Sequence, residues 1–273
     1  WDGVSYKISG INHMAWLLEI SRNGEDLYPI IRKRAQEGPI YAPTLALREL
    51  HPEYADRIPS VAEQFTPDNH HDMVRFEIMK QFGYFVTESS EHSSEYYPWF
   101  IKKDHPELID RFHIPLDEYP RRCRDQIARW KQQAEHLVHN ENLTHTRSSE
   151  YAAGIIEALE TGRTFGFAGN VLNTGLIDNL PFDACVEVSC MVNEGHLSPC
   201  HMGPLPNQLA ALNRRQIEVH QLTVDAALTR KKEYIYQAAM LDPHAGSELT
   251  IDEIRSLVDD LIQAHGDWLP EYH

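Results

Sequence analysis

The strand-like segments of this chain are confined to a few places, and long helical patterns separate them. Residues 8–20 and 164–192 carry most of the alternating or β-branched apolar sequence, whereas residues 118–140 and 205–240 follow a helical period. The regular β-α-β alternation of a doubly wound domain is missing. We therefore expect an α+β fold with mixed or antiparallel strands and several long helices.

The first strand-like segment carries a polar pair that its pattern does not explain. Residues 8–20 (ISGINHMAWLLEI) read as one strand that contains Asn12 and His13 among apolar side chains. A single His on a strand is more often a hydrogen-bonded structural residue than a ligand, so spacing alone favours the structural interpretation. Asn23-Gly24 beyond it is a hairpin-type turn.

The remaining elements follow from capping and period. Helices are expected at 27–36, ended by Gly38-Pro39, and at 70–82, ended by Gly83, with an irregular Pro-rich stretch between them. Further helices are expected over 118–140, from a cap at Ser149 to about residue 160, and over 205–240. Thr250 and Glu253 form a capping box for a last helix that ends before Gly266.

Composition excludes several classes of protein. The net charge of −16 argues against a surface for duplex nucleic acid, which needs clustered Lys and Arg. No apolar run of about 18 residues is present, so no membrane span is expected, and the start resembles no signal peptide. The four cysteines form no C-x-x-C pair and are expected to be reduced thiols, with Cys185 and Cys190 as small buried hydrophobes.

Residues 88–100 (ESSEHSSEYYPWF) concentrate ionisable and aromatic groups. Their serines and Pro98 argue against a regular helix and favour a loop, and such a loop suits a binding site because the elements on either side position it. The alternative is an acidic surface loop anchored in the core by Trp99 and Phe100. These two interpretations are evenly balanced on the residues alone.

Two further groups of residues have ordinary explanations. Residues 169–181 (GNVLNTGLIDNLP) place Asn170, Asn173, Asp178 and Asn179 around a turn, and Asn and Asp are common turn residues. Residues 70–72 (HHD) are expected to open a helix, where the dipole favours an acidic side chain. Neither segment resembles a phosphate loop, a zinc ribbon or a nucleophile elbow.

Taken together, several segments resemble glycoside hydrolase family 4, the NAD-dependent glycosidases, and most resemble its α-galactosidase (melibiase) branch. They cover essentially the whole chain in the family's order: GINHMA (10–15), GYFVTESSEHSSEYYPWFIK (83–102), PLDEYPRRC (115–123), GNVLNTGLIDNLPFDACVEV (169–188) and DPHAGSELTIDEIRSLVDDLIQAHGDWLP (242–270).

The resemblance implies a single unit over residues 1–273. This unit would be the C-terminal catalytic, substrate-binding and oligomerisation domain of the family, of the lactate/malate dehydrogenase-like type. Family members begin with a Rossmann domain that holds the NAD loop and a metal-binding Cys. The sequence is expected to start just after that domain, and none of its four cysteines takes the metal-ligand role.

The resemblance also assigns roles to individual residues. His13 corresponds to the family's ligand for a divalent metal, usually Mn²⁺, although a thiolate with an imidazole suits zinc as well. Tyr96 corresponds to the proposed catalytic base, and Tyr97 is the adjacent alternative. Asn12 is expected to contact the sugar or to orient its neighbourhood. In the segment before the tyrosine, Glu88, Glu91 and His92 are expected to bind sugar hydroxyls or to support Tyr96, with His92 ranked first. Arg121 and Arg122 are taken as solvated helix charges.

The implied reaction is an exception to the two-carboxylate mechanism of most glycosidases. NAD⁺ removes hydride from C3 of the sugar, a base removes the acidified C2 proton, the aglycone leaves from C1, and water addition and re-reduction complete hydrolysis.

The expected enzyme is a cytoplasmic α-galactosidase that acts on melibiose-like glycosides. The alternatives are an α-glucosidase, an α-glucuronidase, a 6-phospho-glycosidase, or a non-catalytic fragment, since the NAD domain is expected to be absent. A homodimer or homotetramer is expected, with no nucleic-acid or membrane partner.

Overall fold

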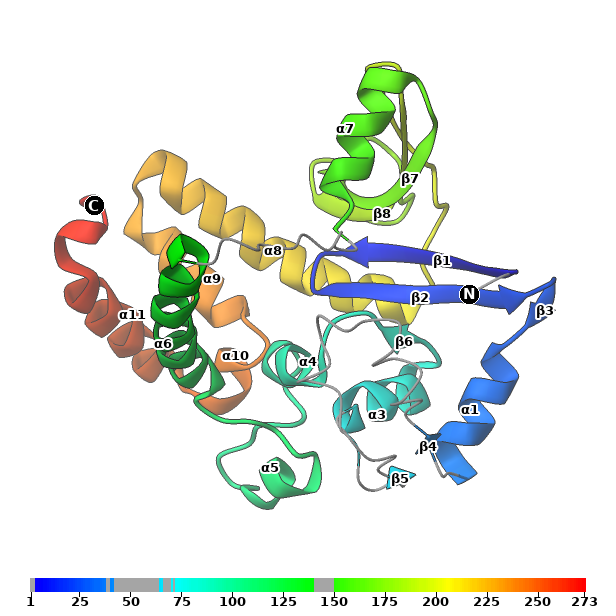
Figure 1. Cartoon of the computed structure of the whole chain (residues 1–273). Helices are drawn as coiled ribbons and strands as arrows, with labels where there is room; N and C mark the ends of the chain where they lie inside the picture. The colour runs from blue at the N-terminus through cyan, green and yellow to red at the C-terminus, as the bar shows by residue number, and fades with distance from the viewer. Residues whose placement is uncertain (1–2, 38–39, 42–63, 66–69, 71, 140–149) are drawn as a thin grey trace.

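The computed structural model describes residues 3–37, 40–41, 64–65, 70, 72–139 and 150–273 (Figure 1). Its strands have these bounds: β1 Val4–Ile11, β2 Met14–Arg22, β3 Glu25–Asp26, β4 Ile40–Tyr41, β5 Gln64–Phe65, β6 Phe85–Val86, β7 Phe165–Leu172, β8 Cys185–Asn193 and β9 His196–Pro199. Its helices are α1 Tyr28–Glu37, α3 Met73–Phe82, α4 Ser90–Tyr96, α5 Glu107–Arg111, α6 Glu118–His139, α7 Ala152–Thr161, α8 Asn207–Thr229, α9 Lys232–Leu241, α10 Ala245–Glu248, α11 Ile251–His265 and the 3₁₀ turn Gly266–Trp268.

The main sheet is antiparallel at every pairing described. Its strands run in the order β3-β2-β1-β8-β7, with β6 added beside β2 and β9 beside β8. A separate small sheet pairs β4 with β5 inside the stretch expected to be irregular, most of which lies outside the described residues. The α+β class with antiparallel strands and several long helices is confirmed.

The expectation of one strand over residues 8–20 is wrong. The structure has a hairpin in which Ile11 pairs with Met14, so Asn12 and His13 form a two-residue loop between β1 and β2. His13 has a φ of 68°, in the left-handed region that side chains other than glycine adopt mainly at turns. The polar pair interrupts the apolar pattern because it stands where the chain reverses.

The second hairpin turn is confirmed. Asn23 and Gly24 connect Arg22 to Glu25, and both residues have positive φ, 52° and 85°. Two consecutive residues with positive φ are the mark of a type I′ turn, whose twist matches that of the flanking strands.

The expectation of a loop over residues 88–100 is also wrong, because residues 90–96 form α4. Ser89 caps this helix by accepting a hydrogen bond from the backbone N–H of His92 at 3.3 Å. Three of the serines that argued against a helix, Ser90, Ser93 and Ser94, are buried on its inner face. Small polar side chains suit this face because the helix packs closely on α3.

The C-terminal helices follow the expected pattern with one break. The helical tract over 205–240 is divided into α8 and α9, because Arg230 adopts the left-handed conformation that ends α8. The capping box of Thr250 and Glu253 opens α11 as expected. Ser149 lies outside the described residues, and the helix that it was expected to cap begins at Ala152 and ends at Gly162.

The core lies between the sheet, α3, α4 and α8. It contains Trp16, Ile78, Tyr97, Val188 and Leu209, all at most 1 % exposed. Each such side chain, when fully buried, contributes about 1.5–3 kcal/mol to the free energy of folding relative to an exposed one.

Cys190 is buried as expected, but Cys185, the first residue of β8, is exposed, and all four thiols are free.

Asn173 is more than an ordinary turn residue. It is fully buried, its Oδ1 accepts hydrogen bonds from the backbone N–H groups of Leu176 and Ile177, and its amide lies within 3.1 Å of three carbonyl oxygens of the same loop. The β7–β8 loop is thus organised around this side chain.

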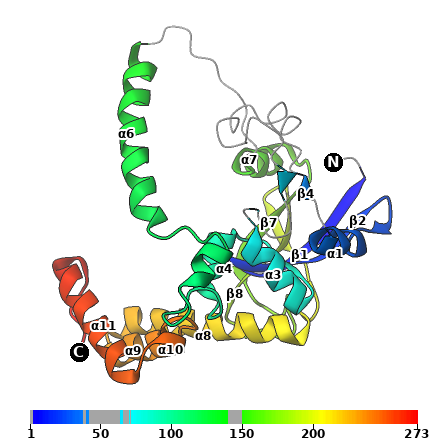
Figure 2. The ribbon, with the colours of Figure 1, turned by 90° about the horizontal axis from the view of Figure 1, so that it is seen from below.

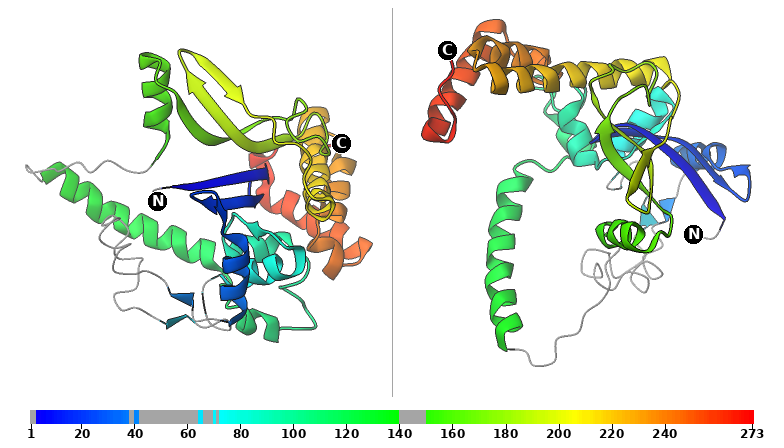
Figure 3. Two further views of the ribbon diagram at one scale, coloured as in Figure 1. Left: turned by 90° about the vertical axis from the view of Figure 1, so that its right-hand side faces the viewer. Right: turned by 90° about the horizontal axis from the view of Figure 1, so that it is seen from above.

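α6 projects away from the rest of the molecule (Figures 2 and 3). None of its residues is buried, although Tyr119, Ile127 and Trp130 are large and apolar. Within the described part of the chain, no helix is long and apolar enough to cross a membrane.

Candidate active site

His13 is presented at the tip of the β1–β2 loop with its side chain 41 % exposed. Gly10, two residues before the loop, has a φ of 152°, and a Cβ on it would lie 2.8 Å from the Met14 carbonyl oxygen and from the Ala15 Cα. Only glycine therefore fits at this point of the hairpin. The close approach of the two strands shapes the hairpin whose loop carries His13.

β6 brings the second half of the site to this loop. Trp16 of β2 pairs with Val86, and the backbone N–H of Thr87 donates to the carbonyl of Ala15 at 2.9 Å. The chain then turns directly into α4. Because β6 is held against the strand that starts at the hairpin loop, the face of α4 necessarily lies beside His13.

Tyr96 and His92 share one face of α4, since they are four residues apart. The Tyr96 hydroxyl lies 3.1 Å from His13 Nδ1. The His92 ring is stacked on the His13 ring with the centroids 5.4 Å apart and the planes 12° from parallel. The structure thus brings together three residues that the sequence singled out.

Two carboxylates surround these rings. Glu88 Oε2 lies 3.6 Å from His13 Nε2, and Glu95 Oε2 lies 3.1 Å from His92 Nδ1. The pKa of Tyr96 is raised above its usual value by burial and, to a smaller extent, by the negative charges of Glu95 and Glu88. Without a nearby positive charge, this phenol stays protonated at neutral pH.

Asn12 points from the same loop toward β8. Its amide donates a hydrogen bond to Glu187 Oε2 at 3.3 Å. Sequence reasoning missed Glu187, although a carboxylate within the apolar strand segment ACVEVSCMV was a usable signal. The hairpin loop therefore has polar side chains on two sides, His13 toward α4 and Asn12 toward β8.

Glu91 lies on α4 but does not contact the three rings in the described contacts. Its carboxylate is paired with Arg122 of α6 at 2.9 Å. Arg121 and Arg122 are more than half exposed, as expected of solvated helix charges, but both also form ion pairs, Arg121 with Glu118 and Arg122 with Glu118 and Glu91.

Whereas Tyr96 contacts His13, Tyr97 contacts the core. Its ring is 1 % exposed, lies 5.3 Å from Trp99 in a parallel stack, and contacts Trp16. Its hydroxyl has no hydrogen-bond partner among the described residues, and burial raises its pKa strongly. Consecutive residues at the end of α4 thus place one phenol at the site and the next in the core.

Asn213 of α8 stabilises the β1–β2 hairpin through two buried hydrogen bonds. It is fully buried, its amide donates to the carbonyl of Met14 at 2.8 Å, and its Oδ1 accepts from Trp16 Nε1 at 3.2 Å. Met14 follows His13 directly, so this side chain fixes the backbone on which the imidazole stands. Sequence reasoning missed Asn213 because a polar residue in a long helix looks like a surface residue.

A divalent cation at His13 would need ligands from beyond the described residues. No three His, Cys, Asp or Glu side chains within the described part of the chain are grouped closely enough to hold an ion. However, the His13 side chain is 41 % exposed, and its Nε2 faces the Glu88 carboxylate. These two groups provide one imidazole nitrogen and one carboxylate oxygen as donors. This donor pair fits a divalent cation that takes its other ligands from elsewhere.

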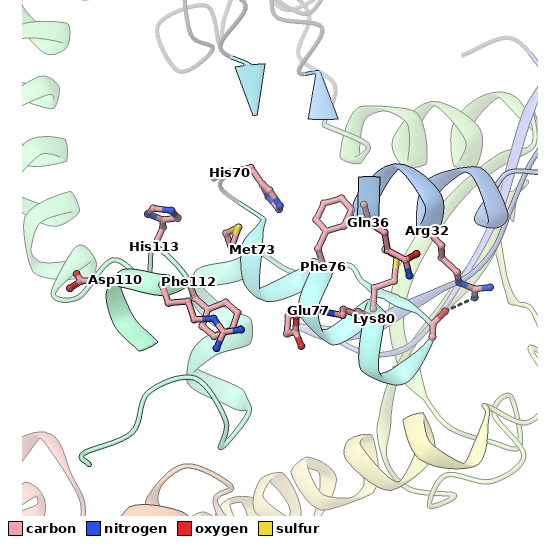
Figure 4. Close-up of a pocket in the computed structure, with 14 residues that line it drawn as sticks. Arg32, Gln36, His70, Met73, Phe76, Glu77, Lys80, Asp110, Phe112 and His113 are labelled. Carbon is pink, nitrogen blue, oxygen red and sulfur yellow. Dashed lines mark hydrogen bonds and ion pairs between the residues drawn. The ribbon is translucent and has the colours of Figure 1, made fainter. Parts of the chain in front are cut away.

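A separate cavity of about 640 Å³ lies among α1, α3 and α5 (Figure 4). Met73, Phe76 and Phe112 line it together with charged residues, and Arg32 at its edge donates to the carbonyl of Gly83. It contains none of the three stacked or hydrogen-bonded rings of the site. The candidate active site is therefore the cluster of His13, His92 and Tyr96.

The arrangement of strands and helices is shared with solved glucosidases. The structure superimposes on lplD of Bacillus subtilis, which is assigned as a glucosidase, with a TM-score of 0.76 at 20 % identity, covering 95 % of this chain and 56 % of that one. It also superimposes on a 6-phospho-α-glucosidase from gut microorganisms, solved in complex with NAD and Mn²⁺, with a TM-score of 0.64 at 20 % identity, covering 100 % of this chain and 57 % of that one. The fold is thus one that occurs within glucosidases.

Residues 8–245 match the model of the "Family 4 glycosyl hydrolase C-terminal domain", and the chain belongs to this family. It is 54 % identical to an α-galactosidase of Bacillus subtilis (strain 168) over 271 residues, which are 99 % of this chain and 56 % of that protein. The chain therefore spans little more than half the length of this curated relative. The family assignment made from the sequence is confirmed.

Proposed function

We propose that this chain is the substrate-binding and proton-abstracting part of an NAD-dependent α-galactosidase. The observation that carries the proposal is the 3.1 Å contact between His13 and Tyr96, which places a metal-ligand type of side chain beside a candidate base. Family membership and 54 % identity to an α-galactosidase support the substrate class.

The role proposed for Tyr96 is to remove the proton from C2 of the sugar. Burial and, to a smaller extent, the neighbouring carboxylates raise its pKa, so it needs a partner that stabilises the phenolate. His13 can act in either of two ways according to its tautomer. With the proton on Nε2, Nδ1 accepts a hydrogen bond from the phenol, whereas with the proton on Nδ1 it donates one to the phenolate.

The divalent metal proposed for the whole enzyme would be held by His13 Nε2 with the Glu88 carboxylate beside it, and its further ligands would come from beyond the described residues. When bound, it supplies Lewis-acid stabilisation of negative charge on a substrate oxygen and a positive charge near the phenol. An imidazole that uses Nε2 as a ligand must carry its proton on Nδ1. That is the tautomer in which His13 donates to Tyr96.

The residues of this chain do not fit NAD. The sequence has no G-x-G-x-x-G, and the described sheet is antiparallel, whereas dinucleotide loops connect a strand to a helix in a parallel sheet. The longer relatives have a region in addition to the one that matches these 273 residues. We therefore propose that NAD binds in the corresponding region of the full-length protein.

Asn12 and His92 are proposed to bind sugar hydroxyls. His92 is stacked on the His13 ring and Asn12 precedes His13 in the hairpin loop, and amide and imidazole groups bind hydroxyls as donors or acceptors. The carboxylates Glu88 and Glu95 make the site electronegative. A neutral galactoside suits these surroundings better than a phosphorylated sugar, which calls for Arg side chains.

The proposal is tested with p-nitrophenyl α-galactoside in the presence of NAD⁺, Mn²⁺ and a reductant. The full-length protein should hydrolyse it and lose activity when either cofactor is withheld, whereas residues 1–273 alone should be inactive. Activity without NAD⁺ would contradict the mechanism, and activity only on 6-phosphorylated or uronic glycosides would contradict the proposed substrate.

The proposed NAD use and the four free thiols support a cytoplasmic site of action.

We also propose that the protein forms a homo-oligomer through α6. Residues 123, 127, 130, 134 and 137 follow the 4-3 spacing of paired helices, and Ile127 and Trp130 among them are 59 % exposed. A second copy of α6 fits this stripe because the spacing is self-complementary. Light scattering should show a dimer or tetramer that a double Ile127→Glu, Trp130→Glu variant converts to a monomer, and an unchanged mass would contradict the proposal.

A further inference from the structure

A second cavity, of about 430 Å³, lies between α4 and the start of α6. His92 and Glu95 line one of its walls. The same His92 ring is stacked on His13, and Glu95 is hydrogen-bonded to His92. The cavity therefore begins one ring away from the place proposed for the reacting carbons of the sugar.

The walls of this cavity carry both apolar and carboxylate groups. Tyr119 and Leu116 line it and are 75 % and 57 % exposed, so their apolar surfaces are open to a ligand. Glu91, Glu95, Asp117 and Glu118 contribute carboxylates, and Arg122 is the guanidinium among the lining residues. A sugar ring has apolar faces and hydroxyl groups at its edges. Its face can pack on the tyrosine ring while its hydroxyls donate hydrogen bonds to the carboxylates.

Ion pairs join the two elements that border the cavity. Arg122 of α6 lies 2.9 Å from Glu91 and 3.5 Å from Glu118, so it joins the start of α6 to α4. The Glu91 and Glu118 side chains are only 16 % and 17 % exposed. These contacts give the cavity a preformed shape and leave the net charge of its lining negative.

We propose that this cavity is the subsite for the leaving group, and that it takes a neutral sugar. This inference rests on the proposed function, which places C1 and C2 of the galactosyl ring at His13 and Tyr96. The leaving group attached to C1 then extends past His92 into the space between α4 and α6. The carboxylates accept hydrogen bonds from its hydroxyls and repel a phosphate or uronate.

The test compares two substrates of the full-length protein with NAD⁺ and Mn²⁺. One is the disaccharide galactosyl-α-1,6-glucose, and the other is α-galactosyl fluoride, whose leaving group is too small to fill the cavity. A Tyr119→Ala variant should lower kcat/KM for the disaccharide about five- to tenfold, mainly by raising KM. It should change kcat/KM for the fluoride less than twofold, and Tyr119→Phe should retain most activity on both.

The matched control is Tyr6→Ala, which removes a similarly exposed tyrosine from β1. An equal loss for both substrates, or no loss for either, would overturn the subsite. A disaccharide whose leaving sugar carries a phosphate or carboxylate should be at least tenfold poorer, and equal rates would overturn the preference for neutral sugars. If the unmodified protein hydrolyses neither substrate, the proposed function itself fails, which is a distinct result.

Discussion

The Nδ1 atom of His13 lies 3.1 Å from the hydroxyl of Tyr96, although 83 residues separate them in the sequence. The first residue belongs to a hairpin loop and the second to a short helix, and β6 joins the two elements. This contact defines the candidate active site and leads to the following predictions.

The adjacent tyrosines provide a matched pair of variants. In the full-length protein, Tyr96→Phe should slow exchange of the C2 proton of the sugar by about 10²- to 10⁴-fold, because a general base is lost, while the variant stays folded. Tyr97→Phe removes a buried hydroxyl that has no partner among the described residues, so it should retain activity and gain about 1 kcal/mol of stability. Proton exchange by NMR and urea unfolding measure the two effects. An unchanged exchange rate in Tyr96→Phe would assign the base elsewhere.

Glu88 should contribute to the ionisation behaviour of Tyr96, after burial and Glu95. Its negative charge helps to hold the pKa of the phenol above the usual value, so Glu88→Gln should lower that pKa. The side-chain signal of Tyr96 in a tyrosine-labelled chain, followed as the pH rises, measures the shift. Glu19→Gln, an exposed carboxylate on β2, is the control and should leave the titration unchanged. A rise in the pKa of Tyr96 after Glu88→Gln would contradict the electrostatic explanation.

Asn213 should matter for both stability and the position of His13. Asn213→Ala leaves the carbonyl of Met14 and the indole N–H of Trp16 buried without these partners, which should cost about 3 kcal/mol in urea unfolding. The NMR signals of the His13 ring should shift because its loop moves. Glu218→Ala, at an exposed position of the same helix, should have little effect on either. If the His13 signal does not shift in Asn213→Ala, Asn213 stabilises the fold but does not position His13.

Glu248 should make stability depend on pH in the acid range. An ion pair with Lys102 and the backbone N–H of Lys103 lower its pKa to about 2 from 4.5. Because the folded state has the lower pKa, this stabilisation is fully present above pH 4.5 and is lost as the pH falls toward 2. Glu248→Gln should therefore be less stable than the unmodified chain at pH 7, and the difference should shrink on acidification. Thermal unfolding at several pH values tests this, and a constant difference would contradict it.

Several local features could be predicted from the sequence because their causes are local. The Asn23-Gly24 turn, the end of α3 at Gly83 and the capping box of Thr250 and Glu253 each depend on residues within a few positions of one another. Residues 88–100 were misjudged because the serines that disfavour a helix in isolation here provide a cap at Ser89 and a compact buried face.

The sequence by itself determined the family, the α+β class and the identity of the polar and aromatic residues that form the site. Only the tertiary structure decided that Asn12 and His13 form a turn, that Tyr96 faces His13 while Tyr97 enters the core, and that Glu91 pairs with Arg122. The reason is physical: residue type and spacing encode local conformation, whereas the pairing of β6 with β2 and the packing of α4 and α8 on the sheet join residues far apart in the chain.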